Sequence, residues 1–422
     1  MKASPFLLLA VCYLGFVSLG LPDTLLGVAW PFIREGFGLE QSAAGAAFVA
    51  MGLAYALSGS ASGRLLGFLG TGRLLVLSSA AVTGAVFGFS LAPAWWVFVL
   101  AALVHGFGSG AIDTGLNDFV SRRFSARHMN WLHACFSLGA AAGPAVMTVA
   151  VQSGGAWRTG YATVGSALLL LTLLFLFTRG GWSEGPDENP VPERVRPPLR
   201  QTLALPVLRW QLALFFLYGG IESSIGQWSF TLLTEWRGWG TAAAGGMVTG
   251  YWFALFVGRV MGGFLVMRTG STRLVRWGIA GAALASTGLV FPLPAAVTGI
   301  CLAVAGLALA PIFPCLMTLT PLRTGSAHSA NAIGLQVTAA TAGIAFWPGL
   351  AGLAAQVAGP QALSVVFSAA ALLLWLVHET GRRRLFRDGE PDSGIVARKS
   401  KIPVSLAREE MEEAIAVESK NP

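Results

Sequence analysis

Long apolar segments separated by short polar gaps occupy the chain from residue 6 to residue 380. A helix needs about 20 apolar residues to cross the hydrocarbon core of a bilayer. Lipid cannot hydrogen-bond exposed backbone groups, so these segments are expected to be helices. The pattern predicts twelve spans, at residues 6–31, 43–65, 74–92, 95–119, 131–152, 158–179, 207–234, 243–266, 273–291, 295–320, 327–353 and 362–380. The expected fold class is an all-α integral membrane protein.

Composition supports this class and excludes several others. Hydrophobic residues make up 54% of the chain and charged residues only 11%, whereas soluble domains carry about 25% charged residues. The net charge of +8 comes from arginines scattered among the polar gaps, and no nucleic-acid-binding motif is present, so no nucleic-acid partner is expected. The four cysteines lie singly in apolar segments, without disulfide or zinc spacing.

The positions of the arginines predict the orientation. Cytoplasmic loops of membrane proteins are enriched in lysine and arginine. The gaps after the second, fourth, eighth and tenth spans contain Arg64, Arg73, Arg122, Arg123, Arg127, Arg268 and Arg323. Both termini are therefore expected in the cytoplasm, with the protein crossing the cell inner (plasma) membrane many times.

A Pro-rich, charged stretch at 181–205 is the only long internal interruption of the apolar pattern. It predicts a cytoplasmic linker between an N-terminal six-helix half at 1–180 and a C-terminal six-helix half at 206–380. Residues 381–422 have mixed charge and are expected to form a cytoplasmic tail, in which AREEMEEAIAVE (407–418) favours a short solvated helix.

The two halves repeat in sequence. GLPDTLLG at 20–27 matches GGIESSIG at 219–226, and the two acids are 222 − 23 = 199 residues apart. SARHMN at 125–130 matches SAHSAN at 326–331, an offset of 201. Internal symmetry between two membrane halves is typical of transporters, whose solute site lies near the midplane between the repeats.

This organisation resembles the major facilitator superfamily. GRLLGFLGTGRLL and GRVMGGFLVMRTGSTRLVR resemble its loop signature, although the usual acid is absent from the first copy. That resemblance implies gating loops with Arg73, Arg259 and Arg273. GLPDTLLGVAWPFIREGFGL, NWLHACFSLGAAAGP, LYGGIESSIGQW and APIFP resemble the fucose-permease-like branch, which includes sugar:proton symporters. The resemblance implies that acids in the first and fourth spans serve solute and proton.

Three carboxylates, Asp23, Asp113 and Glu222, lie well inside predicted spans. A charge at mid-membrane costs about 2.5–3.5 kcal/mol on insertion scales, so each acid needs a reason to be there. The segments suggest no lysine or arginine at similar depth, which favours a carboxyl that can exchange a proton during transport. The alternative is a protonated or hydrogen-bonded acid that only connects helices.

Polar and aromatic side chains inside the spans are candidates for solute binding. His105, Ser109, Asp113 and Asn117 recur at steps of four on one helical face. Amides, carboxylates and indole rings are the groups that hold sugars. The expected solute-binding residues are His105, Asn117, His133, Gln227, Trp228, Asn331, Gln336 and Trp347.

These features together predict a monomeric secondary transporter that imports a small polar solute, expected to be a sugar, by proton symport and alternating access. The alternative is a proton-driven antiporter that exports drugs or metabolites, because GAAAGP at 139–144 resembles part of the antiporter signature. The five histidines are dispersed, and no nucleotide-binding loop is present. The sequence therefore predicts no enzyme activity, no metal and no cofactor, with protons as the coupling ion.

Overall fold

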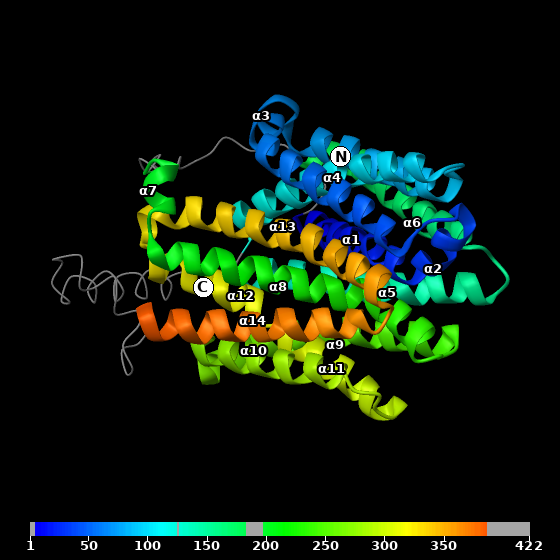
Figure 1. The fold of residues 1–422 in the computed structure, drawn as a ribbon. Coiled ribbons are helices and arrows are strands. Elements are labelled where there is room, and N and C mark those ends of the chain that lie inside the picture. The colour runs from blue at the N-terminus through cyan, green and yellow to red at the C-terminus, as the bar shows by residue number, and fades with distance from the viewer. Residues whose placement is uncertain (1–4, 125, 183–196, 386–422) are drawn as a thin grey trace.

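The computed structural model describes residues 5–124, 126–182 and 197–385, and all regular elements in this part are helices (Figure 1). Ten helical segments of this part are long and apolar enough to cross a membrane. The other two predicted spans correspond to α8 and α10, which also form as helices. The centre of the predicted linker and the predicted helix at 407–418 lie outside the described residues.

In the first half, the predicted spans form with two changes. The first span is divided at Thr24 into two helices, and the second and third spans follow one another in α3, with a break at Gly70, where φ is 72°. Glycine adopts this left-handed conformation without steric penalty. The elements are α1 (Pro5–Asp23), α2 (Leu25–Phe37), η1 (Gln41–Ala43), α3 (Ala44–Leu91), α4 (Trp95–Arg123), α5 (Ala126–Gln152), α6 (Trp157–Thr178) and η2 (Arg179–Trp182).

The second half follows the same plan. The predicted span at 295–320 is divided at Ala310 and Pro311, where PIFP (311–314) begins, and prolines disfavour an uninterrupted helix. The elements are α7 (Leu199–Leu203), α8 (Pro206–Thr231), the π-helical turn η3 (Leu232–Trp236), α9 (Thr241–Thr269), α10 (Ser271–Gly288), α11 (Ala295–Leu309), α12 (Ile312–Thr324), α13 (Ser326–Ala358) and α14 (Ala362–Leu385).

Equivalent helices in the two halves pack through equivalent residues. A Cβ atom on Gly106 of α4 would overlap the carbonyl oxygen of Met51 on α3. On α11, a Cβ atom on Gly306 would overlap the carbonyl oxygen of Tyr251 on α9. The two contacts are equivalent in sequence, because Gly306 lies 200 residues after Gly106 (306 − 106) and Tyr251 lies 200 residues after Met51 (251 − 51). The sequence repeat is therefore also a repeat of helix packing, as expected for pseudo-symmetric halves.

The halves meet along helices that run side by side through the bundle (Figure 1). α5 packs against α9, α3 against α13, and α2 against α8. The loops that follow α2, η3 and α13 lie at one end of the bundle, which we call the far end (Figure 1). We call the opposite end, where α1 begins and α14 ends, the terminal end. Charged and polar side chains that these helices direct toward the other half therefore lie at the contact between the halves.

Candidate functional site

Asp23 lies where the first membrane segment is interrupted. It is the last residue of α1, and Thr24 follows with φ −103° and ψ −4° before α2 begins. The Thr24 hydroxyl donates to the carbonyl of Ala140 on α5 at 2.9 Å, which holds the break against a neighbouring helix. The Asp23 side chain keeps 38% of its surface accessible. Gln227 of the second half donates to the Asp23 backbone carbonyl at 2.7 Å, so this acid lies at the contact between the halves.

α4 brings further candidate residues to Asp23. His105 is 1% exposed, and its Nε2 lies 3.8 Å from Asp23 Oδ1, a distance too long for a hydrogen bond. Asn117 donates to Asp113 Oδ1 at 3.0 Å, and the Asp23 and Asp113 carboxyls are close enough to interact electrostatically. Tyr55 of α3, which was not among the predicted site residues, places its hydroxyl beside Asp113.

We call Asp23, Tyr55, His105, Asp113 and Asn117 the first-half cluster. Within the described part of the chain, neither of its carboxyls forms an ion pair with an arginine or lysine. The structure therefore brings two acids and a histidine close together, and no arginine or lysine among the described residues balances the charge of the acids.

Glu222 has a different environment, and the expectation that no cation lies at its depth is wrong. The Arg259 Nη2 lies 3.2 Å from both carboxylate oxygens of Glu222, and both side chains are largely buried, at 14% and 12% exposed. Tyr218 also donates its hydroxyl to Glu222. One of the three acids inside the membrane spans, Glu222, therefore does form an ion pair with an arginine. Arg259 lies inside α9 rather than in a gating loop.

Arg259 also joins the two halves. Its Nη1 donates to the Ser137 hydroxyl of α5 at 2.5 Å and approaches the His133 carbonyl at 3.5 Å. The His133 ring packs edge-on against Phe16, with 5.3 Å between ring centroids. We call Glu222, Arg259, Tyr218 and Ser137 the second-half cluster, in which one guanidinium group contacts both halves.

The remaining predicted solute-binding residues differ in position. Trp228 is 1% exposed, donates to the Pro348 carbonyl at 2.8 Å, and packs edge-on against Phe48 of the first half with 6.5 Å between ring centroids. Gln336 is fully buried and accepts a hydrogen bond from Thr320 at 3.0 Å. Asn331 donates to the Pro197 carbonyl at 2.9 Å, beside α7 at the terminal end. These three side chains therefore make structural contacts away from the two clusters.

Five of the predicted residues keep a buried polar atom without a hydrogen-bond partner, and three of these atoms are His105 Nε2, Asn117 Oδ1 and Gln336 Nε2. Gln227 Oε1 and Trp347 Nε1 are buried without a hydrogen-bond partner. Gln227 lies at the contact between halves, while Trp347 packs over Gly220 of α8. The predicted gating residues Arg73 and Arg273 are exposed, each three residues after a left-handed glycine at the terminal end. In the described residues, no group of three or more His, Cys, Asp or Glu side chains could hold a metal ion.

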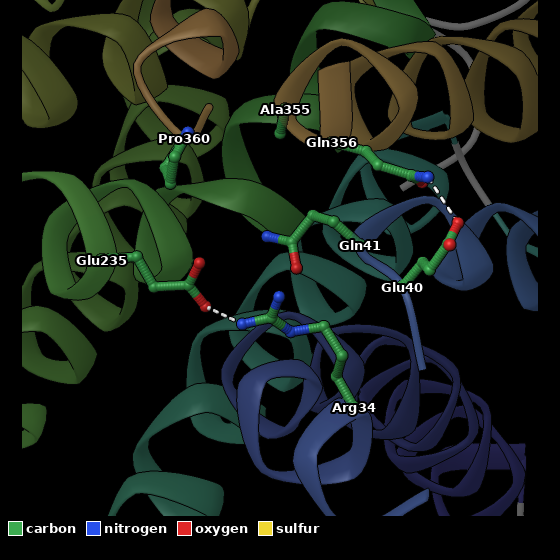
Figure 2. A pocket seen from close by; sticks show the side chains of 7 residues that line it. All are labelled: Arg34, Glu40, Gln41, Glu235, Ala355, Gln356 and Pro360. Carbon is green, nitrogen blue, oxygen red and sulfur yellow. Dashed lines mark hydrogen bonds and ion pairs between the residues drawn. The ribbon is translucent and has the colours of Figure 1, made fainter. Parts of the chain in front are cut away.

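Polar contacts also close the far end between the halves (Figure 2). Arg34 of α2 forms an ion pair with Glu235 of η3 at 2.9 Å. Gln356 of α13 donates to the Glu40 carboxylate and accepts the backbone N–H of Ser42 at 3.2 Å. We call these five residues the far-end interface.

A pocket of about 290 Å³ lies between the contacts of the far-end interface. Gln41 lines this pocket, and Figure 2 shows its amide between the Arg34–Glu235 pair and the Glu40–Gln356 pair. Burial raises the pKa of Glu235 above its ordinary value, while Arg34 acts in the opposite direction. A raised pKa means that the closed interface binds this proton more tightly than an open, solvated glutamate would. Acidification alone is therefore not expected to open the far end.

Reversing one charge of the far-end interface is expected to open it. In Arg34→Glu two carboxylates face each other, and loss of a partly exposed pair is worth about 1 kcal/mol, a shift of about fivefold in population. The measurement is labelling of an introduced Ala355→Cys by a membrane-impermeant maleimide, because Ala355 is buried in the closed arrangement. The double exchange Arg34→Glu/Glu235→Arg should restore slow labelling, and Glu35→Arg, at an exposed neighbour, should have no effect. Unchanged labelling in Arg34→Glu would show that this pair does not hold the far end closed.

Known proteins resemble the chain in sequence and in fold. A protein named "Probable sulfoacetate transporter SauU" from Cupriavidus necator is 28% identical over 194 residues, which is 44% of each chain. The match thus spans less than half the length of that relative. Among solved structures, a bacterial homologue of the human lysosomal transporter Spinster, in an inward-facing and unoccupied conformation, is similar with a TM-score of 0.72 and 13% identity, covering 92% of this chain and all of the other.

Two other solved structures share the fold. The nucleoside transporter NupG is similar with a TM-score of 0.66 and 13% identity, covering 90% of this chain and 99% of the other. The transporter FucP, in its outward conformation, has a TM-score of 0.61 and 16% identity, covering 88% and 98%. A family model described as the Major Facilitator Superfamily matches residues 12–348 of the 422 in the chain. The chain therefore belongs to the Major Facilitator Superfamily, and the protein is a multi-pass membrane transporter of a small solute rather than an enzyme.

Proposed function

We propose that the protein couples the movement of a small polar solute to protons, and that the first-half cluster exchanges the proton. The observation that carries the proposal is the place of Asp23, at the contact between halves, partly accessible and without a basic ion-pair partner other than His105 among the described residues. An intramembrane carboxylate of this kind is typical of proton pathways in transporters. Asp113, next to Asp23, provides a second site for the same proton.

Alternating access supplies the cycle. The far end is closed by contacts between the halves, so release and rebinding of solute there require the halves to rock apart. We place the terminal end in the cytoplasm of the cell that makes the protein, with the bilayer as the plasma membrane, because the arginine-rich gaps fall at that end. The proposed working unit is the monomer.

A sugar is the first solute class that this site would suit. Asn117 and Gln227 supply amides near Asp23, and Trp347 supplies an aromatic surface. The similar proteins include one named as a probable sulfoacetate transporter and one named as a nucleoside transporter. The test must therefore include charged and neutral solutes.

Uptake into proteoliposomes with an imposed pH gradient tests this function. With the outside acidic, the protein should accumulate its solute from a panel of monosaccharides and hydroxy acids, and a protonophore should abolish the accumulation. Downhill movement without any response to the gradient would exclude proton coupling. Outward movement of lipophilic compounds in exchange for protons, with no uptake from the panel, would favour the antiport alternative.

A further inference from the structure

We propose that the solute carries an oxyanion, a carboxylate or sulfonate, which binds Arg259 in exchange for Glu222, and that Glu222 then takes up a proton. This inference rests on the proposed proton-coupled transport and names its solute class. It makes the expected sugar an acidic one, or another small hydroxylated acid, and it gives Glu222 a role distinct from that of the first-half cluster.

The geometry around Arg259 is the first support. A guanidinium is always charged and presents donors in a planar fork that matches a carboxylate or sulfonate. Its Nη2 contacts both oxygens of Glu222 at 3.2 Å. The carboxylate of Glu222 thus occupies the position in which a solute oxyanion would bind. Ser137, bonded to Nη1, would orient the guanidinium in either case.

Charge balance is the second support. A buried arginine without a carboxylate is strongly unfavourable, and so are two carboxylates on one buried arginine. The favourable states therefore have either ionised Glu222 on Arg259 or a solute oxyanion on Arg259 with Glu222 protonated. Both have the same net charge. Because the mixed states are unfavourable, one proton and one anion would load together.

The groups facing Glu222 are consistent with this exchange. On its own helix, Tyr218 donates a hydroxyl hydrogen bond to the carboxylate. From α9, the Tyr251 hydroxyl donates to the Glu222 backbone carbonyl at 2.9 Å and Arg259 supplies the charge. From α5, Ser137 and His133 contact Arg259 rather than Glu222. In the described residues, Arg259 is the only arginine or lysine that forms an ion pair with Glu222.

The position of the pair between halves would connect binding to movement. Arg259 is on α9 of the second half, and Ser137 is on α5 of the first half. A solute anion that replaces Glu222 would become the partner of Arg259, the same side chain that contacts Ser137 across the two halves. Solute binding would therefore alter the contact between the halves. Ligands shift a conformational equilibrium only through such differential contacts.

Anion rescue of Glu222→Gln is the decisive experiment. This variant leaves Arg259 without its carboxylate, so its melting temperature should fall, and millimolar formate, acetate or methanesulfonate should restore it. The double variant Glu222→Gln/Arg259→Met should show no rescue. Glu379→Gln is the matched control, because Glu379 pairs with Arg276 at 2.8 Å near the terminal end, outside this cluster. Absence of rescue by all three anions would overturn the inference.

Proton movement in wild-type vesicles provides a second measurement that does not depend on the variants. Glycolate and 2-hydroxyethanesulfonate should drive proton entry, whereas neutral ethylene glycol should not. If glucose drives proton entry and both anions fail, the proposed function stands and the anionic solute class is wrong. If the anions move without protons, proton coupling is wrong, and so is the proposed role of Glu222.

Discussion

Replacing Asp23 with asparagine is expected to abolish proton-driven accumulation of the solute while leaving its downhill exchange in place. Asparagine has nearly the same shape and can keep polar contacts, but it cannot bind and release a proton. For one proton per solute, a gradient of one pH unit corresponds to about 1.4 kcal/mol, or about tenfold accumulation. In the variant this tenfold accumulation should be lost, and the solute should reach equal concentrations inside and outside the vesicles.

The measurement is radiolabelled solute uptake in proteoliposomes, with and without the imposed gradient. Asp118→Asn is a suitable control, because Asp118 lies on the same helix as Asp113 but forms an exposed ion pair with Arg122. It should keep full accumulation. Full accumulation by Asp23→Asn would remove Asp23 from the coupling mechanism, and loss of exchange as well would indicate a role in solute binding.

Replacing Arg259 with methionine alone is expected to destabilise the protein by about 3–5 kcal/mol. The side chain removed is 14% exposed, and the Glu222 left behind would be buried without its cation. Tyr218 would still donate one hydrogen bond, which cannot replace a positive charge. The double variant Glu222→Gln/Arg259→Met removes both charges and should recover most of the lost stability.

Chemical unfolding in mixed micelles gives the four free energies of this double-mutant cycle. The corresponding cycle at Arg276 and Glu379 should show a smaller coupling, because the Arg276 side chain is 53% exposed. If Arg259→Met and the double variant unfold at the same denaturant concentration, the pair does not contribute through its charges. The proposed exchange of Glu222 for a solute anion would then lose its energetic basis.

Helix positions were predictable because the bilayer restricts the possibilities. The backbone must be hydrogen-bonded internally wherever lipid surrounds it, so an apolar run of sufficient length indicates a helix. The break at residues 310–311 was also predictable, since PIFP contains two prolines. The break at Thr24 was not predicted, although Pro22 lies just before it in α1.

Side-chain partners were less predictable. Arg259 falls inside the predicted span 243–266, and this signal could have suggested an intramembrane cation. The resemblance to a loop signature placed it in a gating loop instead. Trp228 and Asn331 have the chemistry of solute-binding residues, yet Trp228 contacts Pro348 and Asn331 contacts Pro197. Residue type and depth alone do not separate such roles.

The sequence by itself determined the membrane class, the helical segments, the repeat of about 200 residues and the presence of three acids inside the membrane-spanning segments. Each of these depends on local composition or on spacing along the chain, which the bilayer and helix geometry convert directly into structure. The tertiary structure alone decided that Asp23 meets His105 while Glu222 meets Arg259. These contacts join residues on different helices, and they depend on how the helices rotate and cross when their small residues allow close packing.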